Sequence, residues 1–154
     1  MIFDGVKAIT IPEGTVKKIE RNGNVLWQRL NTSVLVCEPV LSVAYAPAYK
    51  PSVGTNVLRA TGTITGISET LIRSVKVKLQ QKHNILGWMN YMSFSDASIT
   101  KSDETTFAYV CDGSTGVVPT PSNYEMRIVA ELTYTDLDGN TKTISTDIPY
   151  VKTW

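Results

Sequence analysis

Hydrophobic and polar residues alternate with a period of two along much of this 154-residue chain. The clearest case is the segment 124–134, where one face carries Tyr124, Met126, Ile128, Ala130, Leu132 and Tyr134 and the other is mostly polar. Successive side chains of a strand point to opposite sides, so this pattern predicts a strand with one buried face. Helical periodicity is nearly absent, and the sequence therefore predicts an all-β protein.

The same alternation predicts six more strands, in the ranges 34–45, 58–65, 75–80, 88–94, 107–111 and 144–148. Pro39 cannot donate to a β-ladder, so we expect it to interrupt the first strand, as in an edge strand that bends or switches sheets. Residues 136–140 predict a tight hairpin before the last strand. Seven short antiparallel strands favour an immunoglobulin-like sandwich over 34–154, with a small barrel as the alternative.

In the strand predicted over 88–94, one face is expected to carry Trp88, Asn90, Met92 and Phe94, and the other Met89 and Tyr91. One of these faces is expected to be core. The other offers a possible aromatic platform for sugar stacking or a protein contact. Tyr49, between two prolines, is a second candidate contact, although a rigid connector is the simpler interpretation. The candidate platform residues are Tyr49, Trp88 and Tyr91.

Residues 1–29 are expected to form a separate β unit, joined to the sandwich by a linker at 30–33. Its hairpin admits two registers. A three-residue loop places Ile19 opposite Trp27 and Arg21 opposite Val25, whereas a two-residue Asn-Gly loop places Lys18 opposite Trp27. The first register groups the apolar residues and is favoured.

A β unit of this size buries little surface and is marginal alone. It should therefore pack against the sandwich, another subunit or a larger assembly. The residues expected to form this docking interface are Ile9, Ile11, Ile19, Val25 and Trp27.

Composition and charge exclude several classes of function. The formal net charge is +1, with five basic and three acidic groups in the first 29 residues, so no basic face predicts binding to nucleic acid or to an anionic membrane. No apolar run approaches the roughly 20 residues that span a bilayer. The opening Met-Ile-Phe-Asp-Gly predicts no signal peptide, and Cys37 and Cys111 are then expected to be reduced and buried.

Candidate chemistry is sparse. His83 is the single histidine, in a polar turn, which leaves little basis for a metal site or a catalytic triad. The Asp136-x-Asp138-Gly139 sequence lacks the ligands of a full calcium loop and is better explained as a turn. Asp96, Asp103 and Glu104 are interpreted as solvated loop charges rather than an acid/base pair. The sequence therefore predicts a protein that is not an enzyme and uses no metal or cofactor.

The segment 9–27 resembles a short motif of structural proteins from phages and prophages of Gram-positive bacteria. The motif has an Ile-Pro-Glu-Gly turn, a Val-Lys-Lys-Ile strand, and Asn-Gly leading to Val-Leu-Trp, and it covers about a fifth of the chain. The resemblance implies a virion component of tail, baseplate or head, made and assembled in the bacterial cytoplasm. It implies other virion proteins as partners and a homo-oligomer within a symmetric assembly.

Two functions follow as expectations. The first is a non-enzymatic virion accessory or decoration protein that docks through residues 1–29 and displays the sandwich. The alternative is a carbohydrate- or host-receptor-binding module that uses an exposed aromatic platform, with a host surface glycan as the partner.

Overall fold

The computed structural model describes residues 18–21, 24–28, 35–52, 55–115 and 124–151. The chain divides into two compact units, Met1–Val34 and Leu35–Trp154. Within the described residues it consists of strands, turns and one short 3₁₀ helix, so the predicted all-β class is confirmed.

The first unit contains an antiparallel hairpin of β1 (Lys18–Arg21) and β2 (Asn24–Gln28). Ile19 is paired with Trp27, as predicted. The prediction for Arg21 is wrong, because Arg21 pairs with Asn24 and Val25 pairs with Glu20. The register shifts between Ile19 and Glu20, so Leu26 is an extra residue in β2. A two-residue Asn-Gly connection and the Ile19–Trp27 pair therefore coexist, because the bulge supplies the missing residue.

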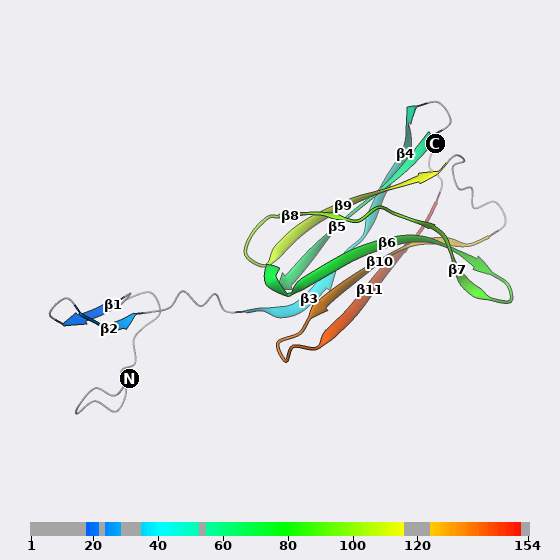
Figure 1. Cartoon of the computed structure of the whole chain (residues 1–154). Coiled ribbons are helices and arrows are strands. Elements are labelled where there is room, and N and C mark those ends of the chain that lie inside the picture. The colour runs from blue at the N-terminus through cyan, green and yellow to red at the C-terminus, as the bar shows by residue number, and fades with distance from the viewer. Residues whose placement is uncertain (1–17, 22–23, 29–34, 53–54, 116–123, 152–154) are drawn as a thin grey trace. The chain divides into compact units, whose positions relative to one another are not determined.

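The second unit is a sandwich of two antiparallel sheets (Figure 1). One sheet has four strands in the order β11-β10-β6-β7, and the other has the order β3-β5-β9-β8 with β4 also paired to β5. The strands are β3 (Cys37–Leu41), β4 (Ala44–Ser52), β5 (Thr55–Ile67), β6 (Ile72–His83), β7 (Gly87–Ser93), β8 (Ser98–Lys101), β9 (Thr106–Thr115), β10 (Met126–Thr135) and β11 (Thr141–Pro149). The 3₁₀ helix η1 (Glu69–Leu71) joins β5 to β6.

The strand order is that of an immunoglobulin-like sandwich. If β3 and β4 are taken together as the first edge strand, one sheet follows the A-B-E-D order of constant-type domains. The other follows G-F-C, with β7 added beside C. The sequence does not predict β8 as a separate strand, because all four of its residues are exposed and no apolar alternation marks it.

The core lies between the sheets and follows the predicted alternation. Met126, Ile128, Ala130 and Leu132 of β10 are buried, whereas Tyr124 lies before the strand and is half exposed. The largest fully buried side chains come from both sheets: Phe107, Leu58, Ile64, Ile67, Leu79, Ile128, Leu132 and Val77. Burial of this shared apolar surface is the main force that holds the two sheets together.

The first edge strand is interrupted, but three residues after the predicted position. Pro39 lies inside β3, where the register against β5 shifts between Cys37 and Val40, and the strand breaks at 42–43. In an edge strand, proline can face the side that has no partner strand, where its missing N–H removes no hydrogen bond of the ladder. Both β3 and β4 pair with β5, so this strand stays in one sheet rather than switching.

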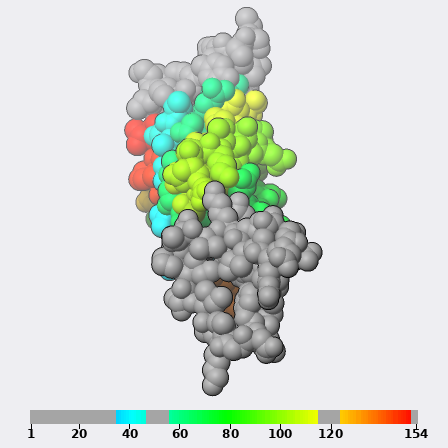
Figure 2. All heavy atoms as spheres, turned by 90° about the vertical axis from the view of Figure 1, so that its left-hand side faces the viewer, coloured from blue at the N-terminus to red at the C-terminus, as the bar shows by residue number. Residues whose placement is uncertain are grey.

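Two contacts connect this edge strand to the opposite sheet. Near the start of β3, the Cys37 thiol Sγ lies 3.8 Å from the carbonyl oxygen of Thr135, at the end of β10. Near the start of β4, the Tyr45 hydroxyl donates to the Val151 carbonyl at 3.0 Å and accepts from the Val151 N–H at 2.8 Å. Figure 2 shows cyan residues of β3 and of the start of β4 beside red residues of β11 along one edge of the sandwich.

The predicted hairpin at 136–140 is confirmed. The Asp136 carboxylate accepts hydrogen bonds from the N–H groups of Asp138 and Asn140 at 3.0 and 2.7 Å, and Gly139 has a φ of 85°. The Asp136 N–H donates to the Asn140 carbonyl, and the Tyr150 N–H to that of Met126. In this hydrogen-bonding pattern, the even-numbered residues of β11 bond to β10, and the backbone N–H and C=O groups of its odd-numbered residues point to the free edge. Pro149 occupies one of these outward positions, where it presents no donor.

Strand β7 corrects one prediction about side-chain direction. The register against β6 shifts between Leu79 and Gln80, which pair with Met92 and Asn90, so Tyr91 is an extra residue. The bulge reverses the alternation at this point. Trp88 and Asn90 therefore lie on the outer face, whereas Met92 and Phe94 pack against the core. The prediction that these four residues share a face is wrong.

Candidate functional site

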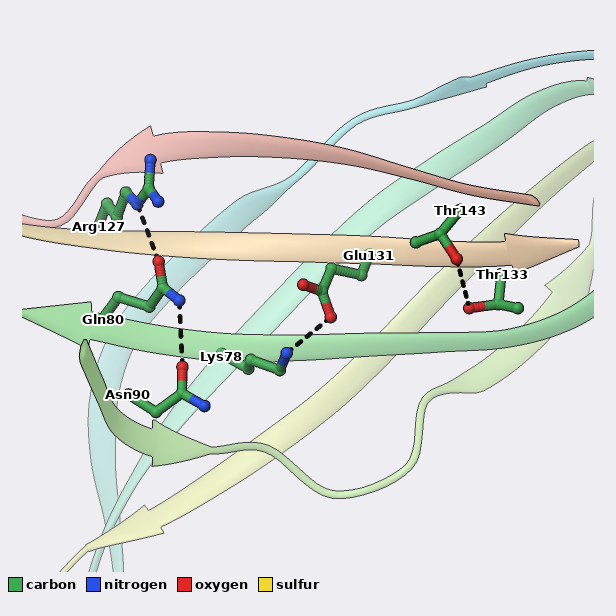
Figure 3. Close-up of polar contacts among 7 residues, drawn as sticks. All are labelled: Lys78, Gln80, Asn90, Arg127, Glu131, Thr133 and Thr143. Carbon is green, nitrogen blue, oxygen red and sulfur yellow. Dashed lines mark hydrogen bonds and ion pairs between the residues drawn. The ribbon is translucent and has the colours of Figure 1, made fainter. Parts of the chain in front are cut away.

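Polar side chains form three separate hydrogen-bonded groups across the outer face of the four-stranded sheet (Figure 3). The Gln80 amide of β6 accepts from the Arg127 Nε of β10 at 3.0 Å and donates to the Asn90 side chain of β7 at 3.1 Å. Lys78 pairs with Glu131 at 2.7 Å. Thr133 and Thr143 are in hydrogen-bond contact at 3.3 Å. Cross-strand pairs of this kind stabilise a sheet and fix its register.

Arg127 is the most constrained charged residue on this face. Its guanidinium carbon lies 4.2 Å from the centre of the Trp88 ring, and a guanidinium nitrogen, Nη1, lies 3.6 Å from the Asp147 carboxylate. The bond to Gln80 adds a third partner. Lys82 lies 5.8 Å from the same indole centre and pairs with Glu125 at 3.0 Å. The side chains therefore hold the guanidinium plane in one orientation.

Beside Arg127 lies a hollow of about 430 Å³, which we call the Arg127 hollow. Its wall includes three aromatic side chains, Trp88, Tyr124 and Tyr150, and three charged ones, Glu125, Arg127 and Asp147. Tyr124 is 50% exposed, whereas Tyr150 is buried and packs against Tyr45 with ring centres 5.3 Å apart. Burial is the main cause of the raised pKa of Tyr150, with smaller contributions from Tyr45 and Tyr91, so its hydroxyl keeps its proton.

The Arg127 hollow lies at one end of the sandwich. Strands β6 and β11 end there, and β10 and β7 begin there. The first described residues of the sandwich lie at the other end, where Cys37 contacts Thr135. The ten residues of β10 separate the two ends, which corresponds to roughly 30 Å.

The three candidate platform residues are not brought together as one described surface. Trp88 lines the Arg127 hollow, but Arg127 lies over its ring. Tyr91 is 49% exposed at the β7 bulge. Tyr49 belongs to β4, where it pairs with Val57, so the segment predicted as a contact loop or connector is a strand. Its side chain lies outside the described residues.

The predicted docking residues belong to the first unit. Ile19, Val25 and Trp27 lie in β1 and β2, for which the structure describes the strand pairing. Ile9 and Ile11 lie outside the described residues. The docking role of all five stays a prediction.

Sequence reasoning missed Tyr124, Arg127 and Asp147 as members of one site. The sequence places Tyr124 and Arg127 in one predicted strand and Asp147 in the next, and assigns a role to none of them. Arg127 and Asp147 are brought together by the β10–β11 hairpin, in which Arg127 lies opposite Pro149 and Val129 opposite Asp147. Trp88 joins them through the order β11-β10-β6-β7 and the β7 bulge. The available indications in the sequence are the predicted hairpin and the cluster of charged and aromatic residues where the strand 124–134 begins.

Other candidate chemistry is structural within the described residues. His83 is exposed at the end of β6, and its Nδ1 accepts from the N–H groups of Ile85 and Leu86 at 3.3 and 3.4 Å. Cys111 is buried, Cys37 is only half-buried, and both thiols are free. No group of three His, Cys, Asp or Glu residues in the described ranges could hold a metal ion.

A second hollow, of about 460 Å³, lies against the five-stranded sheet. Its described lining is mostly Ser, Thr, Ala and Gly, and carries no charged side chain. It offers few groups that could orient a ligand, so the Arg127 hollow is the stronger candidate.

Comparison with protein-family models and with curated protein sequences finds no match for this chain. Among the described residues, no helix has the length and apolar character required to cross a membrane.

Proposed function

We propose that this chain is a non-enzymatic structural component of a phage virion, an accessory protein of tail, baseplate or head. The N-terminal unit docks it to the particle, and the sandwich is displayed. The observation that carries the proposal is the resemblance of residues 9–27 to phage structural proteins. Its partners are other virion proteins, and copies of the chain are arranged by the symmetry of the particle.

The size of the hairpin supports a docking role for the first unit. Strands β1 and β2 have four and five residues, and an isolated two-stranded hairpin is marginally stable in water. The Ile19–Trp27 pair places two large apolar residues opposite each other in this hairpin. Burial of such a pair against a partner would supply the stabilisation that the hairpin cannot supply alone.

Deletion of residues 1–29 tests the docking role. Tagged full-length and truncated chains would be produced in a bacterial strain that makes the particle, and purified particles would be probed for the tag. We expect the truncated chain to remain folded, with an unchanged melting temperature, and to be missing from the particles. Normal incorporation of the truncated chain would show that the docking role is wrong.

A point variant makes this test sharper. Trp27→Ala should reduce incorporation strongly, because it removes the largest apolar residue of the hairpin. Gln28→Ala, which changes the neighbouring residue, serves as the matched control and should leave incorporation unchanged. Equal incorporation of the two variants would argue against Trp27 as a docking residue.

A second candidate function is a carbohydrate- or host-receptor-binding module. One observation favours it: the Arg127 hollow combines aromatic side chains with charged groups, and Gln80 and Asp147 hold the Arg127 side chain in place. The two functions are compatible, because the hairpin and the hollow belong to different units of the chain.

A further inference from the structure

We propose that the Arg127 hollow binds a neutral saccharide. The assignment rests on the second candidate function and names its site and its ligand class. It does not depend on docking, which uses the other unit of the chain. The hollow has a volume of about 430 Å³, within the range of roughly 300–1,000 Å³ found for small-ligand sites.

The aromatic wall suits one face of a sugar ring. A pyranose presents C–H groups on its faces, and these pack against the electron-rich face of an aromatic ring. The Trp88 indole already carries the Arg127 guanidinium at 4.2 Å. Tyr124 is 50% exposed and lines the same hollow, so it offers the more accessible stacking surface.

The polar groups suit hydroxyls. The Arg127 guanidinium can donate hydrogen bonds in one plane to the oxygens of ligand hydroxyls. The carboxylates of Glu125 and Asp147 can accept hydrogen bonds from the O–H groups of such hydroxyls. Neighbouring hydroxyls of a sugar can therefore bind in pairs. Arg127 is held by Gln80, Trp88 and Asp147 before any ligand arrives, which lowers the entropy lost on binding.

The charges of the hollow favour a neutral ligand. Glu125 is paired with Lys82 at 3.0 Å and Asp147 with Arg127 at 3.6 Å. A cationic ligand would compete with Lys82 and Arg127 for these carboxylates, and an anionic ligand would meet two negative groups. A neutral polyol can hydrogen-bond to all of them without displacing either pair.

The place of the hollow fits a displayed module. It lies at the end of the sandwich that β10 separates from the first described residues, by roughly 30 Å. A chain held at its N-terminal side would keep this end of the sandwich accessible.

Oligosaccharide binding by the full-length chain tests the assignment. The probe is an array of neutral oligosaccharides built from glucose, galactose, mannose and the corresponding N-acetylated amino sugars. Sialylated oligosaccharides, which are anionic, and oligosaccharides with free amino sugars, which are cationic, are included for comparison. We expect at least one neutral oligosaccharide to bind. Its affinity should fall roughly tenfold or more in Tyr124→Ala and in Asp147→Asn.

The matched control is Leu137→Ala, since Leu137 is 61% exposed in the 136–140 turn and is not among the residues that line the hollow. Its affinity for the same oligosaccharide should equal that of the unmodified chain, and the melting temperatures of all variants are measured alongside. Three outcomes would overturn the assignment: no neutral oligosaccharide binds, only charged ones bind, or Leu137→Ala weakens binding as much as Tyr124→Ala. The Tyr124→Ala variant should be incorporated into particles normally. Failure of saccharide binding can therefore be distinguished from failure of docking.

Discussion

At the scale of single residues, one glycine and one tyrosine fix the spacing between β5 and the first edge strand. Tyr109 is buried, and its hydroxyl donates to the Ser42 carbonyl at 2.6 Å. Its ring lies in the space that a side chain at Gly62 would fill: a Cβ there would lie 2.5 Å from the Tyr109 oxygen and closer still to the Ser42 backbone. The absence of a side chain at position 62 is therefore required by the packing.

Gly62→Ala should destabilise the sandwich by about 1–3 kcal/mol, because the new methyl group meets backbone that cannot move freely. Urea denaturation measures this free energy of unfolding. Gly113→Ala is the matched control, since its Cβ would meet the flexible end of Met92 at 2.7 Å. A smaller loss is expected there, and equal losses in both variants would contradict the packing argument.

Cys111 gives the sandwich a sensitivity to alkaline pH. Burial, with a smaller effect of Asp112, raises the pKa of this thiol from 9.0 to about 11. The folded state therefore holds the proton more tightly than the unfolded chain. The resulting stability is fully present below pH 9 and is lost as the pH rises towards 11.

Between pH 8 and pH 11, Cys111 should account for a loss of about 2 kcal/mol in the free energy of unfolding. Cys111→Ala removes the titrating group, so its stability should fall less steeply over the same range. Denaturation curves of both proteins at several pH values provide the comparison. Parallel curves would show that the thiol makes no such contribution.

At the scale of elements, regular alternation was enough to predict most strands but not the direction of every side chain. The apolar face of β10 is predicted correctly, because the apolar residues at every second position of this ten-residue strand are mostly the buried ones. In β7, aromatic residues occur in both phases, and nothing in the sequence marks Tyr91 as the extra residue. β8 escaped detection because all four residues are exposed. The Arg127 hollow could not be predicted as a whole for a further reason: Trp88 joins the residues of β10 and β11 only through the order of the strands.

The bulge makes a specific prediction about deletions. Removal of Tyr91 would let Asn90 and Met92 follow one another opposite Gln80 and Leu79, as in regular pairing. We expect the free energy of unfolding to change by less than about 1 kcal/mol. Removal of Met92 instead would bring Tyr91 opposite Leu79. The Tyr91 ring, which is larger than the Met92 side chain, would then lie near Gly113. That variant should be clearly less stable, and thermal unfolding followed by circular dichroism would separate the two.

At the scale of the whole molecule, the sandwich is closed along one edge by side chains rather than by a shared ladder. The Tyr45 hydroxyl makes two hydrogen bonds to the backbone of Val151, and its ring packs against buried Tyr150. Cys37 makes the corresponding contact at the other end of this edge. These contacts join the first edge strand of the sandwich to the end of β10 and to the residues that follow β11.

Tyr45→Phe should keep the ring packing and remove both hydrogen bonds, at a cost of about 1–2 kcal/mol. Hydrogen exchange at the Val151 amide should become faster, while the amides of β10 keep their protection relative to global unfolding. Tyr134→Phe, which removes a hydroxyl near the other end of β10, is the control and should leave exchange at Val151 unchanged. Unchanged exchange at Val151 in Tyr45→Phe would contradict the closing role.

The direction in which the first and last strands run has a mechanical consequence. The edge strand passes from the Thr135 end at Cys37 to the Val151 end at Tyr45, and β11 runs the same way to Pro149. A force that pulls residues 35 and 151 apart therefore acts along these strands, and must slide one past the other. Contacts at both ends of the edge then bear the load together instead of opening one after another.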